Sequence, residues 1–504
     1  MRLVVKLNKE DNVAVAVKPI VKGTQVTEDL VALEDIPEAH KIALADIPKG
    51  GIIRRYNTVI GYAKEDIAKG RWITQFMVRL PEAPGLDNMP FGTNIVTELP
   101  EPPIKTWWGY PNPLGGSAGT RNLLGIMTTV QCAVGVLKVA VGRIRKELLP
   151  KYPNVDGVVP ISHEYGCGVA INAPEAKVPI RILQNLTHHP NFGGQIMVVG
   201  LGCEKLTPEK LLPEIENNPD NVIILQEQSG GLNGMVQAIM DMADKKLAIL
   251  NQRKRVELPL SALSVGLQCG GSDAFSGVTA NPSAGYAADM LVKGGATVMF
   301  SEVTEARDGA HLLAARCVNE NVRDKLAAEM KWYDHYLEEA EVDRDANPTP
   351  GNKKGGLANI VEKSMGSIAK SGTSPIVEVL SPGERPTKHG LIYAATPSND
   401  FACGPCQLAS GIGVHVFMTG RGSTYGLAEV PVIKVCSRTD LKEFMPDIID
   451  VNAGPIATGD ADISEIGTEL FRLILAVASG KEKPFAEQWG IQNDLCIFNP
   501  APLT

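Results

Sequence analysis

The chain has 504 residues, and because a single hydrophobic core rarely grows beyond about 250–300 residues, this length predicts two or three domains. Hydrophobic residues make up 44% and charged residues 21%, as in globular proteins, and the net charge of −8 gives no general attraction to nucleic acid or anionic membranes. These values exclude a protein held to nucleic acid or membrane by bulk charge, so a small molecule is the expected partner.

No segment has the features of a secretory leader or a membrane span. The N-terminus lacks a charged stretch followed by an apolar one, and Gly or charged residues interrupt the apolar stretches before the roughly 20 residues that a span requires. The nine cysteines, an odd number in a long chain, do not resemble a disulfide framework. We therefore expect a cytoplasmic protein with buried or liganding thiols and no membrane partner.

The first 80 residues predict a small all-β module. Short β-type runs at 13–17, 42–44, 52–55 and 58–60 are separated by Lys-Gly, Pro-Lys-Gly-Gly and Tyr-Asn turns. A linker is expected over residues 81–105, where six prolines favour an extended connection.

The rest of the chain alternates strand-like and helix-like patterns. Apolar runs at 155–161, 196–201, 222–225, 264–267 and 297–300 predict buried strands, and apolar residues at steps of three and four between 236 and 250 mark one helix face. This alternation predicts an α/β fold with parallel or mixed sheets flanked by helices. A polar segment at 245–257 separates a second domain, over residues 106–250, from a C-terminal domain over residues 251–504.

Polar side chains follow two of the predicted strands directly. The sequence QCGGSD (268–273) follows the run at 264–267, and SEVTE (301–305) follows the run at 297–300. Open α/β sheets bind ligands outside the carboxyl ends of their strands. The sequence therefore predicts chemistry at these two strand ends.

Cysteines recur after strand-like runs. TTVQC ends at Cys132, VGLGC at Cys203 and VGLQC at Cys269, and Cys167 follows the run at 155–161 within HEYGCG. A single cysteine is more often a small buried packing residue than a ligand. The four together predict a site, with three polar residues beside them: His163, Glu204 and Asp273.

These motifs resemble those of the altronate and galactarate dehydratase family. The N-terminal module, through HKIAL (40–44) and YNTVIG (56–61), is similar to the SAF domain that opens family members. One departure is Gln131 before Cys132, where the family leads us to expect His or Asn. Segments at 151–157, 347–369 and 385–397 resemble the galactarate branch more than the altronate branch. The other similar stretches, in chain order, are GGSAGTRNLLG (115–125), HEYGCGVAI (163–171), GLGCEK (200–205), QCGGSDAFSGVTANP (268–282), FSEVTE (300–305), PGNKKGGLANIVE (350–362), TGRG (419–422) and NAGPIATG (452–459).

The resemblance implies syn or anti loss of water from a six-carbon dicarboxylic sugar acid such as galactarate, giving a keto acid of the 5-dehydro-4-deoxy-glucarate type. Such an elimination removes a proton α to a carboxylate and expels the β-hydroxyl, so it needs a base, an acid and positive charge near the developing dianion. The alternatives are altronate dehydration, a carbon–sulfur lyase of the same superfamily, and a sugar-acid binding protein without activity.

The resemblance also implies a divalent metal, Fe²⁺ first, with Mn²⁺ or another divalent ion as alternatives. Two arrangements stay open: a mononuclear iron held by His and carboxylates, which we favour, and an iron–sulfur cluster on three cysteines with one open iron. No C-x-x-C-x-x-C run brings cluster ligands together locally. Iron accepts imidazole, carboxylate and thiolate ligands, and the candidates are His40, His163, Cys167, Cys203, Cys269 and Glu204.

Proton transfer requires a group that can be neutral near pH 7. His163 is the first candidate for the base, because an unperturbed histidine titrates near working pH. Lys353 or Lys354 is the rival base, since a lysine crowded by a metal can lose its proton. Glu302 and Glu305 are candidates for a metal ligand or a proton donor. Asp273 is a further catalytic candidate.

The two carboxylates of the expected substrate need cations and fixed hydrogen-bond donors. A homodimer is a reasonable expectation for large parallel sheets, although no counted feature requires it. The candidates for substrate binding are Arg121, Arg307, Arg421 and Ser272.

Overall fold

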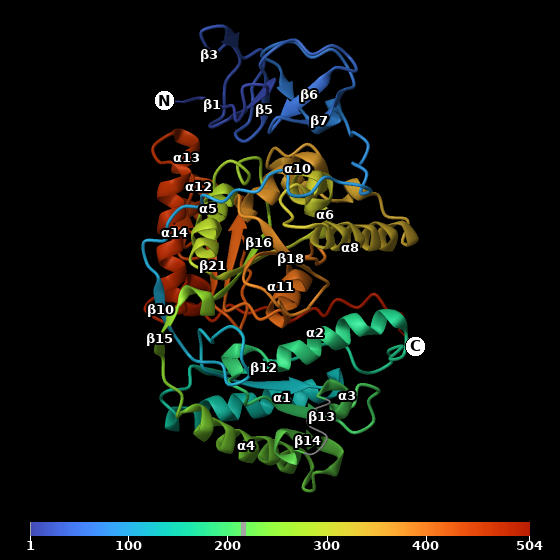
Figure 1. Cartoon of the computed structure of the whole chain (residues 1–504), viewed down its shortest axis with the longest axis vertical. Helices are drawn as coiled ribbons and strands as arrows, with labels where there is room; N and C mark the ends of the chain where they lie inside the picture. The colour runs from blue at the N-terminus through green and yellow to red at the C-terminus, as the bar shows by residue number, and fades with distance from the viewer. Residues whose placement is uncertain (1, 213–217, 504) are drawn as a thin grey trace.

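The computed structural model describes residues 2–212 and 218–503 and shows three parts stacked along the long axis of the molecule (Figure 1). A β module lies at one end, a C-terminal α/β domain in the middle, and a second α/β domain at the other end. The predicted fold class, an all-β module followed by two α/β domains with sheets flanked by helices, is confirmed.

The N-terminal module is built from short antiparallel strands. The turn between β6 and β7 is Tyr56-Asn57, and both residues have positive φ (60° and 56°), as two-residue hairpins require. The first sheet has the order β1-β2-β5-β8, the second β6-β7-β9, and the third β3-β4. Their bounds are β1 (Val4–Val5), β2 (Val13–Ala16), β3 (Gln25–Thr27), β4 (Leu30–Val31), β5 (Lys41–Ala43), β6 (Ile52–Arg55), β7 (Thr58–Ala63), β8 (Trp72–Ile73) and β9 (Val78–Arg79).

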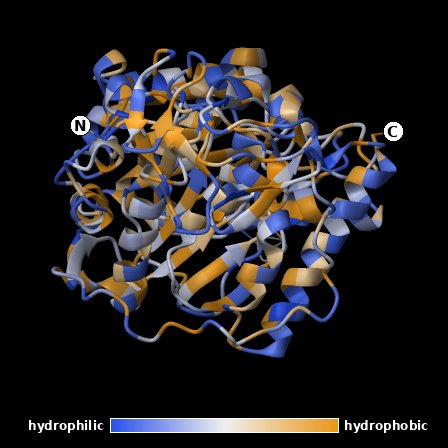
Figure 2. Ribbon diagram, turned by 90° about the horizontal axis from the view of Figure 1, so that it is seen from above, coloured by the Kyte–Doolittle hydropathy of each residue, from blue (hydrophilic) through white to orange (hydrophobic). Residues whose placement is uncertain are grey.

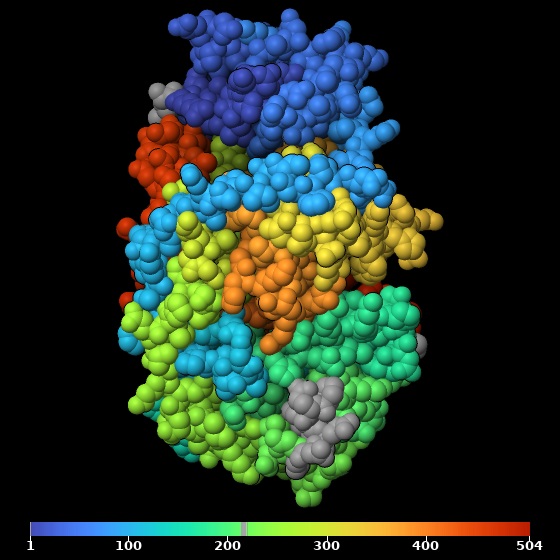
Figure 3. Space-filling model, in the orientation of Figure 1, coloured from blue at the N-terminus to red at the C-terminus, as the bar shows by residue number. Residues whose placement is uncertain are grey.

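Residues 80–105, all of which the structure describes, contain no helix or strand. The segment is extended, as its prolines predict, but it is not a free spacer. It runs as a band across the surface of the C-terminal domain (Figure 3). The amide of Gly92 donates to the carbonyl of Cys317 at 3.1 Å, and Lys331 pairs with Asp87 at 2.6 Å. The linker therefore packs along the surface of the C-terminal domain.

The second domain hangs from a two-stranded ribbon. The chain enters through β10 (Thr106–Gly109) and leaves through β15 (Val256–Pro259), and these strands pair in antiparallel fashion. Between them lies a four-stranded parallel sheet with the order β12-β11-β13-β14. Its strands are β11 (Leu123–Thr128), β12 (Gly157–Ile161), β13 (Met197–Gly200) and β14 (Val222–Ile224).

Helices cover both faces of this sheet. The helices α1 (Gln131–Arg143) and α4 (Gly231–Leu250) pack on the outer face, and α4 buries the apolar stripe that its sequence predicts. On the other face, α2 (Lys177–Thr187) lies between the sheet and the C-terminal domain (Figure 1). A short helix, α3 (Pro208–Leu211), follows β13.

The C-terminal domain has a seven-stranded parallel sheet with the order β18-β19-β17-β16-β20-β21-β22. The chain moves from β16 toward β17 and later returns to β20 on the other side of β16. The carboxyl ends of β16 and β20 therefore form the switch point at which such sheets bind ligands. The strands are β16 (Ser264–Cys269), β17 (Thr297–Phe300), β18 (Ile376–Leu380), β19 (Gly390–Ala394), β20 (Val414–Thr419), β21 (Val432–Cys436) and β22 (Val451–Asn452).

The central strands of this sheet are fully buried, as expected for a parallel sheet with helices on both faces. Seen from above, apolar strands occupy the interior and hydrophilic residues gather toward the periphery (Figure 2). Across the described residues, no helix is long and apolar enough to cross a membrane. The helices are α5 (Ala280–Lys293), α6 (Val303–Ala306), α7 (Ala310–Ala314), α8 (Glu320–Glu339), α9 (Pro350–Lys354), α10 (Ile360–Ile368), α11 (Asp400–Ala409), α12 (Thr439–Phe444), α13 (Pro455–Thr458), α14 (Ile463–Ala478) and α15 (Phe485–Gln488).

Candidate active site

Three side chains with metal-binding atoms meet at the carboxyl edge of the seven-stranded sheet. Cys269 is the last residue of β16, Glu302 follows β17, and Glu305 lies in α6. One ligand atom of each lies within 4.8 Å of the others, and all three side chains are buried. Because β16 and β17 are parallel neighbours, the two polar strand ends singled out in the sequence lie together.

Glu302 occupies a strained position in this cluster. Its φ of 82° is unusual for a residue with a side chain; such a conformation costs about 1–3 kcal/mol and persists only where the surrounding structure holds it. Its amide donates to Thr396 Oγ1 at 3.2 Å, and its Oε2 accepts from the amide of Cys269 at 3.2 Å. Its Oε1 is buried and has no hydrogen-bond partner, so one oxygen of this carboxylate is unpaired.

Two buried lysines complete the cluster. Lys370, in the 3-10 turn η12 (Ala369–Ser371), has its Nζ 2.6 Å from Glu302 Oε2 and 3.4 Å from Cys269 Sγ. Lys363, in α10, has its Nζ 2.7 Å from Glu305 Oε1. Each carboxylate therefore has its own ammonium partner.

The sequence prediction did not include either lysine. A signal is present, because α10 and η12 are almost entirely buried and small or apolar, so that lysines within them must have partners inside the protein. The two lysines can be recognised as site residues only once the segment is known to be buried.

Burial is the largest single influence on the pKa values of Cys269, Glu302 and Glu305. It raises the pKa of the Cys269 thiol to about 12, so the thiol keeps its proton unless a cation replaces it. Burial also raises the pKa of Glu302, and the charge of Lys370 only partly opposes this. For Glu305 the raising effect of burial is outweighed by Lys363, and its pKa is lowered. Glu302 is thus the carboxylate that most readily takes up a proton near neutral pH.

Burial alone would lower the pKa of Lys370, but the charges of the Glu302 and Glu305 carboxylates, and of Cys269 when it is a thiolate, outweigh burial, and the net pKa is raised. Lys370 is therefore charged as long as these groups keep their charges. Its protonation depends on the charge state of the cluster.

Asp273 and Arg421 lie at the switch point, four residues past Cys269 and two residues past β20 respectively. The carboxylate of Asp273 accepts from the amide of Ser276 at 2.8 Å and pairs with Arg438 Nε at 3.1 Å. The amide of Arg421 donates to the carbonyl of Gly271 at 2.9 Å, while its side chain is exposed. Asp273 is engaged with protein groups, and the exposed side chain of Arg421 is available to a ligand at this edge.

Ser272, Lys353 and His40 lie around the same edge. The carbonyl of Ser272 accepts from Asn352 in α9 at 2.8 Å, and Lys353 Nζ is 3.9 Å from Asp345. His40, from the β module, approaches the carbonyl of Lys354 through Nε2 at 3.2 Å and accepts from Trp72 Nε1 at Nδ1, also at 3.2 Å. Both ring nitrogens of His40 are thus engaged with protein groups at the interface between the module and the domain.

Four other predicted residues lie in the second domain, apart from this cluster. His163 is buried, its Nε2 donates to the carbonyl of Thr128 at 2.6 Å, and burial lowers its pKa to about 4. The carboxylate of Glu204 accepts from the amides of Gly202 at 2.7 Å and its neighbour Cys203 at 2.9 Å. The side chains of Cys167 and Cys203 are exposed. The structure does not bring these residues to Cys269.

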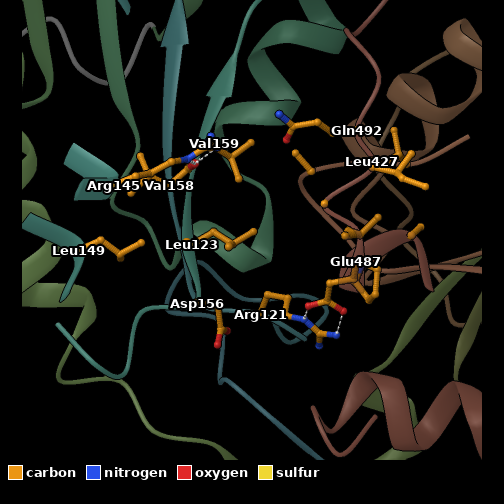
Figure 4. A pocket seen from close by; sticks show the side chains of 17 residues that line it. Arg121, Leu123, Arg145, Leu149, Asp156, Val158, Val159, Leu427, Glu487 and Gln492 are labelled. Atoms are coloured by element: carbon orange, nitrogen blue, oxygen red, sulfur yellow. Dashed lines mark hydrogen bonds and ion pairs between the residues drawn. The ribbon is translucent and has the colours of Figure 1, made fainter. Parts of the chain in front are cut away.

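Two predicted substrate-binding arginines are held by acidic partners elsewhere. Arg121 forms a double hydrogen bond with Glu487, at 2.8 and 2.6 Å, inside a cavity of about 370 Å³ between the two α/β domains (Figure 4). Arg307 binds Asp334 in α8 at 2.8 Å and the carbonyl of Pro84 in the linker at 2.8 Å. Both guanidinium groups connect parts of the chain.

Three family models together match most of the chain. One described as the altronate/galactarate dehydratase SAF domain matches residues 2–81. One described as the D-galactarate dehydratase/altronate hydrolase second domain matches residues 109–251. One described as the C-terminal part of D-galactarate/altronate dehydratase matches residues 260–503. The matched regions fall on the three parts of the structure.

Two curated relatives align with nearly the whole chain, and a third aligns with about two thirds of it. It is 56% identical to galactarate dehydratase (L-threo-forming) of Escherichia coli, over 99% of this chain and 97% of that one. It is 33% identical to altronate dehydratase of Bacillus subtilis, over 95% of this chain and 96% of the relative. It is 31% identical to the (2R)-sulfolactate sulfo-lyase subunit beta of Chromohalobacter salexigens, over 65% of this chain and 84% of that subunit.

Proposed function

We propose that this chain, which belongs to the D-galactarate/altronate dehydratase family, removes one molecule of water from galactarate. The choice of galactarate is supported by the near-complete alignment with a curated galactarate dehydratase. The structural observation that carries the proposal is the buried cluster of Cys269, Glu302 and Glu305 with Lys363 and Lys370 at the carboxyl edge of the sheet. It combines potential metal ligands with groups that can exchange a proton.

In the proposed reaction, a base removes the proton on the carbon next to one carboxylate. The electron pair forms a carbon–carbon double bond as the hydroxyl on the next carbon leaves with a proton as water. The resulting enol becomes a keto acid of the 5-dehydro-4-deoxy-glucarate type. The first step develops a second negative charge on the carboxylate group next to the deprotonated carbon, so positive charge must lie close by.

Cys269, Glu302 and Glu305 fit a divalent metal, with Fe²⁺ as our first choice. They offer one thiolate and two carboxylates, a donor set that iron accepts, and the unpartnered Oε1 of Glu302 is a free ligand atom. A metal held there would act as a Lewis acid and stabilise the charge that develops on the substrate carboxylate.

We assign Lys370 as the base. Its pKa is raised because three potentially negative groups surround it, whereas burial acts to lower it. Once those groups are neutralised, burial dominates and the buried amine can be neutral at working pH. Lys370 then takes the α-proton through Nζ.

We assign Asp400, the first residue of α11, as the proton donor to the leaving hydroxyl. Burial raises its pKa to about 6, so part of the population is protonated near neutral pH. Its Oδ1 accepts from Gln268 Nε2 at 2.9 Å, which places it beside the end of β16.

Our proposed contacts for the substrate carboxylates are Arg421 and Ser272 at the switch point, with Lys353 on α9.

The test is keto-acid formation by the full chain, purified without oxygen and supplied with Fe²⁺. Galactarate is expected to give product, whereas altronate and sulfolactate are expected to react much more slowly. Absence of product from galactarate, with folded and iron-loaded protein, would contradict the proposed function. Faster turnover of altronate, or sulfite release from sulfolactate, would replace it with one of the two alternative activities.

Two variants test whether the base is Lys370 or His163, the residue expected from the sequence. Lys370→Met is expected to lower kcat by about 10²–10⁴-fold, the usual contribution of a positioned proton-transfer group. His163→Asn, in a separate domain, is expected to retain most of the turnover per folded molecule. A reversed result would return the role of base to His163.

A further inference from the structure

Three exposed cysteines lie at the carboxyl edge of the sheet in the second domain. Cys132 is in the first turn of α1, after β11, Cys167 follows β12, and Cys203 follows β13. All three are free thiols. Free cysteine is among the residue types most often buried, and five of the six cysteines of the C-terminal domain are buried here. Exposure of three thiols at one sheet edge is therefore not explained by packing.

The topology of the sheet brings the three loops together. β11 lies between β12 and β13, and all three strands are parallel. Met127 near the end of β11 is opposite Ile161, and Thr128 is opposite Val199. The strands thus end at nearly the same level, although their cysteines are 35 and 36 residues apart in sequence.

Hydrogen bonds fasten the three loops to one another. His163, after β12, donates from Nε2 to the carbonyl of Thr128 at 2.6 Å. The carbonyl of Gly166 accepts from the amide of Leu206, after β13, at 3.3 Å. The carboxylate of Glu204 bonds the hydroxyl of Thr129. His163 and Glu204, expected from sequence to be ligands, therefore brace the loops that carry the cysteines.

A glycine is required where two of these loops touch. Gly166 precedes Cys167, has a φ of +115°, and a Cβ built on it would lie 2.0 Å from the carbonyl oxygen of Thr129. This close approach holds the Cys167 loop directly against the residues that lead into Cys132.

We propose that Cys132, Cys167 and Cys203 bind an iron–sulfur cluster at this edge. Thiolates are the protein ligands that hold such clusters. Three ligands leave one iron of a four-iron cluster open to an oxygen atom of a small hydroxy acid or carboxylate. The site differs from the set expected from sequence, because Cys269 lies in the other domain and Cys132 takes its place.

The spacing of the thiols does not suit a single ion. Thiolates around one zinc ion, each at about 2.3 Å from the metal, cannot lie more than about 4.6 Å apart. Among the described residues, the group whose ligand atoms all lie within 4.8 Å is Cys269, Glu302 and Glu305, and the three exposed cysteines do not form one. In a cluster each cysteine binds its own iron, so the sulfur atoms stand farther apart.

Cluster binding requires three thiols to lose their protons to solvent. Cys132 lies at the start of a 13-residue helix with no acidic residue in its first turn, and the helix dipole favours a negative charge there. The site does not depend on the proposed dehydration, since it uses residues of another domain.

The test is anaerobic reconstitution of the full chain with Fe²⁺ and sulfide. We expect the visible absorbance band of an iron–sulfur centre, with about four irons and four acid-labile sulfides bound per chain in addition to any mononuclear metal. Cys132→Ser, Cys167→Ser and Cys203→Ser are each expected to lose most of the band and of the bound sulfide. Cys496→Ser, another exposed thiol, and Cys269→Ser serve as controls and should keep both.

Several results would overturn the proposal. They are the absence of the band and of sulfide in the folded chain, retention of both in all three variants, and loss of both in Cys269→Ser. Iron or Zn²⁺ bound by the three cysteines without sulfide would show a single-ion site instead. Circular dichroism of each variant before reconstitution separates loss of the cluster from loss of the fold. Keto-acid formation is measured separately, so failure here is distinguishable from failure of the proposed function.

Discussion

The pairing of Glu302 with Lys370 makes a prediction at the scale of single residues. Both side chains are almost completely buried, and their charged atoms are 2.6 Å apart. Removing one partner of a buried ion pair leaves an uncompensated charge and costs about 3–5 kcal/mol, whereas removing both costs much less. Lys370→Met should therefore lower the free energy of unfolding by about that amount, and Lys370→Met combined with Glu302→Gln should recover most of it.

Urea denaturation, followed through the unfolding transition of the C-terminal domain, measures this effect. Lys331→Met is the matched control, because Lys331 and Asp87 form a pair that is largely exposed and such pairs contribute about 0–1 kcal/mol. An unchanged midpoint for Lys370→Met would mean that Glu302 is neutral in the folded protein. Turnover should be lost in both Lys370 variants, which separates the stability effect from the proton-transfer role.

Site residues could be predicted from the sequence where short nearby motifs were enough to place them. Cys269, Glu302 and Glu305 follow short apolar strands, and parallel pairing of two adjacent strands is enough to place them together. Lys363 and Lys370 come from α10 and the 3-10 turn η12, more than 50 residues further along, and nothing in their own neighbourhood shows that this segment packs back onto the strand ends. The positions of strand-end residues could be predicted, whereas their ion-pair partners required the tertiary structure.

At the scale of elements, the β module is fastened to α10 through one buried carboxylate. Glu362 pairs with Lys41 at 3.0 Å, also binds Arg55, and accepts from the amide of Ala358 at 2.7 Å. Burial alone raises the pKa of Glu362, but Lys41 and Arg55 outweigh it and hold the pKa below its usual value. This carboxylate is therefore the ionic part of the contact that holds the module on the C-terminal domain, beside hydrogen bonds such as that from Asn359 to the carbonyl of Ile60.

Glu362→Ala should release the module from the domain. It leaves Lys41 and Arg55 buried without their partner, a loss of about 3–5 kcal/mol from docking. Limited proteolysis should then cut faster within residues 80–105, and keto-acid formation should fall because His40 and its neighbours no longer cover the site. Asp29→Ala, which breaks an exposed pair with Lys69, is the control within the same module. Equal cleavage rates for the two variants would count against this docking role.

The linker shows why the sequence predicted the conformation of an element but not its packing. Its prolines predict an extended segment, and it is extended. Its packing depends on partners more than 200 residues away, as in the contact of Arg307 with Pro84. The composition of a segment predicts its conformation. It does not predict the surface, distant in sequence, against which the segment packs.

At the scale of the whole molecule, the sequence led us to expect one metal site drawing on residues from both α/β domains. The structure separates them, because the second domain hangs from the ribbon of β10 and β15 and directs its sheet edge elsewhere (Figure 1). Alternating strands and helices predict that each domain has a ligand-binding edge. They do not predict how two such edges are oriented, because orientation is set by the ribbon and by contacts such as Arg121 with Glu487.

Buried histidines in both α/β domains predict how the whole molecule responds to acid. Burial lowers the pKa of His163 and His189 to about 4 and that of His415 to about 3. In the unfolded chain a histidine titrates near 6.5, so between pH 6.5 and 4 the unfolded state binds more protons than the folded state. The stability that these histidines contribute is complete above pH 6.5 and is lost as the pH falls. The loss approaches about 1.4 kcal/mol per pH unit for each histidine.

Denaturation midpoints between pH 7.5 and 5 measure this slope in a window above the range in which ordinary carboxylates titrate. His415→Phe should flatten the slope of the C-terminal transition, because Phe preserves a ring against Tyr425 but cannot take up a proton in the unfolded chain. His335→Gln, at an exposed pair with Glu339, should leave the slope unchanged. If His415→Phe left the slope of the C-terminal transition unchanged, His415 would take up a proton in the folded protein as readily as in the unfolded chain. The second domain should weaken in parallel, because His163 and His189 belong to it and both stay neutral there while the unfolded chain takes up protons.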